Sequence, residues 1–99
     1  MSKPVLGIIG GGQLGSLLSV DAKKLEIKTV IFSDDPDAPA QNFADHFICG
    51  NYEDKKNINN FSNLVDVVTY EFENIPFNIL DSIHKIKNVL PKPEINKLI

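Results

Sequence analysis

The stretch Gly7-Ile8-Ile9-Gly10-Gly11-Gly12-Gln13-Leu14-Gly15 decides the fold, because it predicts a strand, a tight turn and a helix in direct succession. An apolar run ends at Ile9, and four glycines lie among the next six residues. Glycine has no Cβ atom and tolerates positive φ, so the backbone can approach a ligand closely here. The N–H groups at the start of the following helix favour an anion, and the spacing Gly10-x-Gly12-x-x-Gly15 matches the dinucleotide-binding fingerprint.

Hydrophobic patterning beyond this loop predicts strands and helices in alternation. Strands are expected at 4–9, 28–32, 46–49, 65–70 and 88–90. Helices are expected from Gln13, from a cap at Asp37, from a cap at Asp54, from Pro76 and from Pro93 to Ile99. This order is typical of an α/β domain with a mainly parallel sheet, whose ligands bind at the carboxyl ends of the strands.

The same patterning predicts which side chains are buried. Leu14, Leu17, Leu18, Ala22 and Leu25 share one face of the first helix, and its serines lie off that face. Three further sets are expected in the core: Ile58, Phe61 and Leu64; the stripe Phe77, Leu80, Ile83 and Ile86; and Cys49 as a small buried hydrophobe. Tyr52 is expected to cover the sheet edge.

Composition narrows the class of protein. The 99 residues fit one domain, and the net charge of −3 argues against a nucleic-acid surface. All ten basic residues are lysines, so an anion here must rely on backbone amides, hydroxyls or lysine. One cysteine, no signal peptide and no apolar run of membrane-spanning length favour a soluble cytoplasmic protein. His46 and His84 lack partners at ligand spacing, so no metal site is expected.

Ser33 and Asp34 are site candidates because they follow the second expected strand. Asp34 falls where a dinucleotide-binding domain carries the acidic residue that holds ribose hydroxyls. The alternative is a solvated turn formed by Asp34, Asp35 and Asp37. In the glycine loop, Gly12, Gln13 and Leu14 could offer backbone N–H groups to a ligand, and Gln13 also its side-chain amide. The alternatives are a tight turn whose glycines serve packing only, a solvated helix start for Gln13, and a core position for Leu14, which we expect in any case.

The stretch Thr69-Tyr70-Glu71-Phe72-Glu73-Asn74-Ile75-Pro76 is the second informative motif. Glu71 and Glu73 point the same way by the strand period, and two like charges would accommodate a cationic or amine-bearing ligand. The alternative is a solvated strand end, with Asn74 capping the next helix. A dinucleotide-binding domain has no use for this acidic stretch, because negative charge beside a pyrophosphate is unfavourable.

Taken together, six motifs resemble the amino-terminal domain of the 5-(carboxyamino)imidazole ribonucleotide synthetase family, usually called PurK, over essentially all 99 residues. They are Gly10–Gly15, Asp37–Ala40, Ala44-Asp45, Gly50–Asp54, Asp66–Pro76 and Leu90-Pro91. The resemblance implies a Rossmann-like parallel sheet flanked by helices, the pre-ATP-grasp domain. It also implies an ATP-dependent ligase that carboxylates aminoimidazole ribonucleotide with bicarbonate in purine biosynthesis, commonly as a homodimer.

The resemblance further implies which domain of the enzyme binds each ligand. ATP and Mg²⁺ would bind between ATP-grasp lobes that lie beyond Ile99, so no catalytic residue is assigned in this chain and the chain alone is expected to be inactive. The amino-terminal domain would contribute to the ribonucleotide site through Gln13, Leu14 and Glu73 or Glu71. The chain stops inside an expected helix, which suggests a fragment. The competing hypothesis is an NAD-type or other nucleotide-binding module without catalytic activity.

Overall fold

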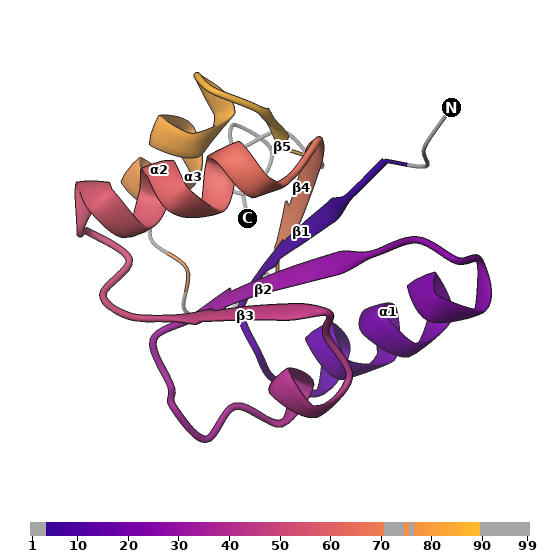
Figure 1. Cartoon of the computed structure of the whole chain (residues 1–99). Helices are drawn as coiled ribbons and strands as arrows, with labels where there is room; N and C mark the ends of the chain where they lie inside the picture. The colour runs from indigo at the N-terminus through magenta and orange to yellow at the C-terminus, as the bar shows by residue number, and fades with distance from the viewer. Residues whose placement is uncertain (1–3, 71–74, 76, 90–99) are drawn as a thin grey trace.

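The structure, a computed structural model, describes residues 4–70, 75 and 77–89 (Figure 1). It contains a five-stranded parallel sheet with helices on both faces, so the expected Rossmann-like α/β fold is confirmed. In chain order the elements are β1 (Leu6–Ile9), α1 (Gln13–Lys24), β2 (Thr29–Ser33), the 3-10 helix η1 (Pro39–Asn42), β3 (His46–Cys49), α2 (Lys55–Leu64), β4 (Val67–Tyr70), α3 (Phe77–His84) and β5 (Asn88–Val89).

The strand order is β3-β2-β1-β4-β5, which places the first strand at the centre. β1 pairs with β2 on one side, with Ile9 opposite Phe32, and with β4 on the other, with Ile9 opposite Tyr70. The chain builds outward from β1 to β3 and then crosses back to β4. The direction of winding therefore reverses at β1, which is where sheets of this kind bind their ligands.

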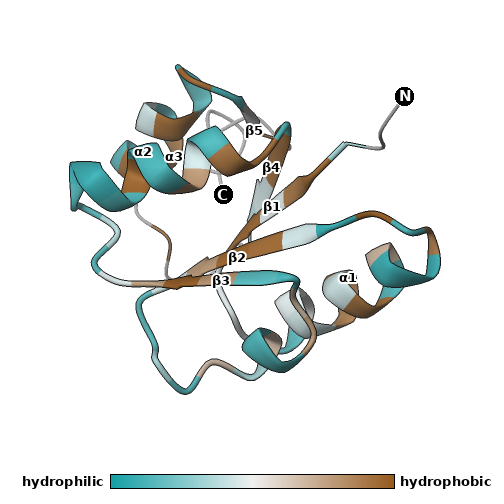
Figure 2. Ribbon diagram, viewed as in Figure 1, coloured by the Kyte–Doolittle hydropathy of each residue, from teal (hydrophilic) through white to brown (hydrophobic). Residues whose placement is uncertain are grey.

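Two hydrophobic cores lie on opposite faces of the sheet. α2 and α3 cover one face, and α1 with η1 covers the other (Figure 1). Strand residues alternate between the two cores: Ile9 and Phe32 belong to the first, and Ile8 and Ile31 to the second. Figure 2 shows brown hydrophobic segments concentrated in the central strands, as expected for a sheet buried on both faces.

α1 packs largely through small residues, and the expected face is wrong at Leu17 and Leu25 but confirmed at Ala22 and Leu18. Leu17 and Leu25 are 57% and 61% exposed, whereas Gly15, Ser19 and Ala22 are buried. The Ser19 hydroxyl donates to the Gly15 carbonyl at 2.8 Å, which satisfies the serine inside the core. Small side chains let the helix lie close to the sheet, so Leu18 is only partly buried against the smaller core and Leu17 is turned outward.

Element boundaries agree closely with expectation, with one correction at the short helix. β3 matches its expected range, and Asp54 caps α2 by accepting a hydrogen bond from the Lys56 N–H at 2.9 Å. The short helix after β2 is a 3-10 turn whose N-cap is Ala38, so Asp37 does not cap it. Instead the Asp37 N–H donates to the Asp35 carboxylate at 2.9 Å.

Three other expectations about burial are corrected, and a fourth is extended. Cys49 is exposed because it ends β3, an edge strand paired on one side only. Leu64 and Ile86 are each 46% exposed, since one ends α2 and the other lies beyond α3. Tyr52 does more than cover the sheet edge, because its side chain is buried in the larger core. The expected helix from Pro93 to Ile99 lies outside the described residues.

Two aspartate side chains form hydrogen bonds to backbone N–H groups near the amino ends of β1 and β2. Asp45 accepts a hydrogen bond from the Thr29 N–H at 2.9 Å, and its own N–H donates to the Thr29 carbonyl at 3.1 Å. Asp66 accepts from the Val5 N–H at 2.7 Å. Each aspartate directly precedes a strand and ties it to its neighbour, which gives Asp45 and Asp66 a structural role. No described helix has the length and apolar character needed to cross a membrane.

Candidate functional site

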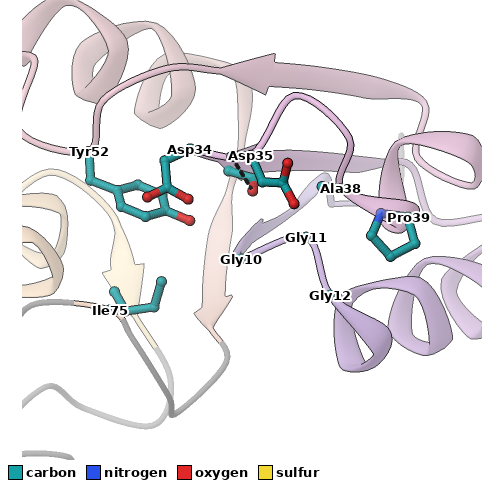
Figure 3. Close-up of a pocket in the computed structure, with 10 residues that line it drawn as sticks. Gly10, Gly11, Gly12, Asp34, Asp35, Ala38, Pro39, Tyr52 and Ile75 are labelled. Carbon is teal, nitrogen blue, oxygen red and sulfur yellow. Dashed lines mark hydrogen bonds between the residues drawn. The ribbon is translucent and has the colours of Figure 1, made fainter.

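A cavity of about 220 Å³ lies at the carboxyl edge of the sheet, against the glycine loop (Figure 3). Its lining residues follow four different strands, although they are scattered through the sequence. They are Gly10, Gly11, Gly12, Ser33, Asp34, Asp35, Ala38, Pro39, Tyr52 and Ile75. This is the position at which the strand order predicts a ligand.

The glycine loop is held by its own chain. Gly10 adopts a φ of 105°, which disfavours any side chain, and its N–H donates to the Phe32 carbonyl at 2.8 Å. A Cβ atom on Gly11 would lie 2.5 Å from the Ala38 Cβ and 3.2 Å from the Ser33 Oγ. The Gly11 carbonyl also accepts from the Ala40 N–H at 3.0 Å. Gly11 is therefore required by packing against the segment that follows β2.

The end of β2 supplies the polar wall. Ser33 is 3% exposed, and its hydroxyl oxygen accepts from the Asp35 N–H at 3.1 Å. Asp35 is in turn held by the Asp37 N–H. Asp34 is exposed, and within the described residues its carboxylate accepts no hydrogen bond. Asp34 is thus the acidic side chain of this wall that is left available to a ligand.

Aromatic and aliphatic side chains form the opposite wall. Tyr52 is 8% exposed and packs edge-on against Phe32, with ring centroids 5.1 Å apart and planes at 68°. Ile75 is also 8% exposed and borders the same cavity. Figure 3 shows the Tyr52 ring beside the Asp34 carboxylate, with Ala38 and Pro39 across the cavity near Gly11 and Gly12. The cavity therefore combines a carboxylate, a hydroxyl and an apolar surface.

A second cavity lies at the opposite edge of the sheet, near the amino ends of β1, β2 and β3. It measures about 400 Å³, and its lining includes Thr29, Asp45 and His46. The Asp45 carboxylate is already engaged by the Thr29 N–H. Ligand-binding loops of parallel α/β sheets follow the carboxyl ends of strands, so the smaller cavity is the better candidate site.

The structure places the residues expected to form the site in different positions. Gly12, Ser33 and Asp34 line one cavity. Gln13 opens α1 next to that cavity with an exposed side chain, and Leu14 is the second residue of the helix. Glu71, Glu73 and Asn74 lie outside the described residues. No cluster of three or more potential metal ligands occurs among the residues that the structure describes.

Ala38, Pro39, Tyr52 and Ile75 line the cavity but were not predicted from the sequence. Tyr52 could have been predicted from the sequence, because it follows the third strand and therefore lies at the carboxyl edge of the sheet. No sequence feature predicts that Ala38 and Pro39 line the cavity, since their position depends on how the segment after β2 folds back onto Gly11.

Burial raises the pKa of Tyr70 above its usual value of 10.0, because the ionised phenolate would lose hydration at the end of β4. The raised pKa favours the protonated phenol in the folded state. Its contribution to stability is therefore complete below pH 10 and is lost as the pH rises through the folded-state pKa. We expect urea unfolding midpoints to fall as the pH rises above 10, and to fall less in Tyr70→Phe. Parallel pH profiles for the two proteins would contradict this.

The fold and the site define the class: a Rossmann-like α/β domain with its candidate ligand cavity at the carboxyl edge, beside a glycine loop. The whole chain, residues 1–99, matches the family described as the ribonucleotide synthetase preATP-grasp domain. The chain belongs to this family.

The relatives found by sequence and by structure are named as the same enzyme, N5-carboxyaminoimidazole ribonucleotide synthase. The chain is 37% identical over 95 residues to an N5-carboxyaminoimidazole ribonucleotide synthase of Bacillus subtilis, covering 96% of this chain and 24% of that protein. The Staphylococcus aureus synthetase, solved in complex with ADP, has 36% identity and a TM-score of 0.88, covering 96% of this chain and 26% of that one. The chain thus spans about a quarter of these proteins.

An Aspergillus clavatus synthase shares the fold, with a TM-score of 0.82 and 24% identity over 96% of this chain and 26% of its own. That protein was solved with ADP and 5-aminoimidazole ribonucleotide. All three relatives are similar to this chain in the part that carries the glycine loop and the parallel sheet.

Proposed function

We propose that this chain is the substrate-binding amino-terminal domain of an ATP-dependent ligase that carboxylates aminoimidazole ribonucleotide with bicarbonate in de novo purine biosynthesis. The family match over residues 1–99 and the names of the relatives support the enzyme class. The observation that carries a binding role is the cavity formed by the glycine loop and the end of β2. The ADP and 5-aminoimidazole ribonucleotide bound to the Aspergillus clavatus synthase support this choice of ligand.

In this proposal, residues at the start of α1 face the ribonucleotide. Gly12 is the N-cap of α1, so Gly12, Gln13 and Leu14 carry N–H groups at the positive end of the helix dipole. These groups favour an anionic ligand, and the Gln13 side chain is exposed beside them. Ser33 and Asp34 complete the wall contributed by β2.

Glu71, Glu73 and Asn74 complete the proposed site from the chain segment that follows β4. Glu71 comes directly after Tyr70 in the sequence, and Tyr70 ends a strand adjacent to β1. The carboxylate of Glu71 or Glu73 would orient the ribose hydroxyls or the aminoimidazole amine. The domain then contributes by position, since holding the amine in place for the incoming carboxyl group removes an entropic barrier.

ATP and Mg²⁺ belong, in this proposal, to ATP-grasp lobes outside residues 1–99, where ATP supplies the phosphoryl group that activates bicarbonate. We also propose a cytoplasmic location and a homodimeric full-length enzyme. Sedimentation of the full-length protein as a monomer would contradict the dimer.

Calorimetric titration of the 99-residue chain tests the binding role. We expect heat of binding with aminoimidazole ribonucleotide and none with NAD at the same concentrations. Binding of NAD without binding of the ribonucleotide would favour an NAD-type module, which the Gly10-x-Gly12-x-x-Gly15 spacing and Asp34 also fit.

A phosphate-release assay tests the proposal that ATP binds outside residues 1–99. We expect no bicarbonate-dependent ATP hydrolysis by the purified chain, because the residues that would hold ATP are assigned elsewhere. A bicarbonate-dependent signal that survives removal of trace ATPases would overturn that assignment.

A further inference from the structure

We propose that residues 93–99 form a short helix whose apolar side docks on the α1–β4 surface, which we define as Leu17 and Leu18 of α1 with Val67 and Thr69 of β4. The occupant of this surface is therefore a segment of the same chain. The inference goes beyond the proposed function and does not depend on the ligand, because it concerns a face of the sheet and not its carboxyl edge.

One face of β4 is less buried than the other, although β4 is an inner strand paired with both β1 and β5. Val68 and Tyr70 belong to the larger core, whereas Val67 and Thr69 alternate to the other face and are only partly buried. The register sets Thr69 beside Ile8 of the smaller core. Among the described residues, that smaller core includes none from β4 or β5. By contrast, β2 is buried at every residue.

α1 presents leucines toward this face of β4. At about 100° per residue, Leu17, Leu18 and Leu25 fall on one flank of the helix. Ser19 and Ala22, which are buried against the sheet, lie next to this flank. With the right-handed crossover that strand–helix–strand units adopt, the leucine flank turns away from η1 and toward β4. Leu17 and Leu25 are more than half exposed, so this flank has apolar surface left to bury.

The chain after β5 carries a matching pattern. Residues 93–99 read Pro-Glu-Ile-Asn-Lys-Leu-Ile, and Pro93 suits the first turn of a helix. Ile95, Leu98 and Ile99 then share one side of that helix, at the spacing i, i+3, i+4. A helix this short is marginal by itself and needs packing on an apolar surface.

The end of β5 places the segment within reach. Val89 ends β5 and pairs with Val68, so the chain leaves the sheet about 4.8 Å from β4. The connection from Val89 to Pro93 spans up to about 13 Å, which is enough to cross to β4 and rise over it. α2 and α3 already cover the opposite face (Figure 1). The α1–β4 surface is therefore the apolar surface open to the segment.

Spin labelling tests the docking in the 99-residue chain. A nitroxide is attached at Lys97→Cys, off the apolar side of the segment, in a Cys49→Ser background because Cys49 is exposed and would also react. We expect the backbone amides of Leu18, Val67 and Thr69 to lose most of their magnetic resonance intensity, because the label lies close to them.

Asn59 and Ser82 provide the reference within the same spectrum. They are exposed on α2 and α3, on the opposite face of the sheet, and should keep most of their intensity. Losses centred on Asn59 or Ser82, or intensities unchanged throughout, would overturn the proposal.

A matched pair of variants tests the apolar contact. Leu98→Ser in the labelled chain removes an apolar side chain from the docking side and should restore the lost intensities. Asn96→Ser changes the same segment off its apolar side and should leave the losses in place. The dispersion of the remaining amide signals reports that each variant is folded. Losses that persist in Leu98→Ser would show that apolar packing does not hold the segment.

A mixing experiment separates the chain's own segment from a second copy. Spin-labelled chain without isotope label is added to isotope-labelled chain without spin label. We expect no selective loss at Leu18, Val67 or Thr69, because each surface is already occupied by its own segment. The same losses as in the doubly labelled chain would assign the surface to a second copy and overturn the proposal. Every one of these outcomes leaves the proposed function standing.

Discussion

Replacing Gly11 with alanine is expected to weaken ribonucleotide binding by at least about tenfold and to lower the free energy of unfolding by about 1–3 kcal/mol. The added Cβ would lie 2.5 Å from the Ala38 Cβ, closer than packed carbon atoms allow. Either the glycine loop or the segment at Ala38 must move, and both line the cavity. Calorimetric titration and urea denaturation measure the two effects.

A second-site change makes this prediction specific. Ala38→Gly in the Gly11→Ala background removes the methyl group that the new Cβ would meet. We expect partial recovery of both affinity and stability, because the remaining contacts, with the Cβ and Oγ of Ser33, are at 3.2 Å. If the double variant binds no better than Gly11→Ala alone, crowding against Ala38 is not the cause.

Replacing Phe61 with alanine is expected to have the largest effect on stability, a loss of about 3–5 kcal/mol. Phe61 is fully buried between α2 and the sheet, and its ring is tilted against that of Phe32 at 5.4 Å. It lies directly over β1, since a Cβ on Gly7 would come within 2.6 Å of the Phe61 Cζ. Loss of this ring leaves a cavity above the central strand, and a small domain has only about 5–15 kcal/mol in total.

Leu64→Ala is the matched control for Phe61→Ala, because it truncates a large side chain of the same helix that is 46% exposed. Its cost should be well below that of Phe61→Ala in the same urea titration. Equal costs would show that α2 is stabilised by its own helix formation rather than by packing on β1.

The sequence predicted the fold because local signals and burial agree in the strands. The apolar run 4–9 contains the buried strand β1 at Leu6–Ile9, and Asp54 caps α2 by accepting from the Lys56 N–H. The expected face of α1 was wrong at Leu17 and Leu25 because the patterning rule assigns the core to large side chains. Gly15 and Ser19 are buried beside the correctly predicted Ala22, and nothing local shows how closely a helix approaches its sheet.

The candidate site was predictable in part, for a topological reason. Gly12, Ser33 and Asp34 follow two adjacent parallel strands, so they meet at one edge without any further information. Ala38 reaches the glycine loop only because the chain after β2 folds back on Gly11. Tyr52 joins the cavity because its ring packs on Phe32, a contact between residues far apart in the sequence.

The most direct test of the ribonucleotide site is a nuclear magnetic resonance titration of the isotope-labelled chain with aminoimidazole ribonucleotide, following every backbone amide. We expect saturable shifts at Gly11, Gly12, Asp34 and Tyr52, all on the carboxyl edge. Thr29 and His46 line the cavity at the opposite edge and should remain unchanged. Shifts centred on Thr29 and His46, or no saturable shift at the glycine loop, would contradict it.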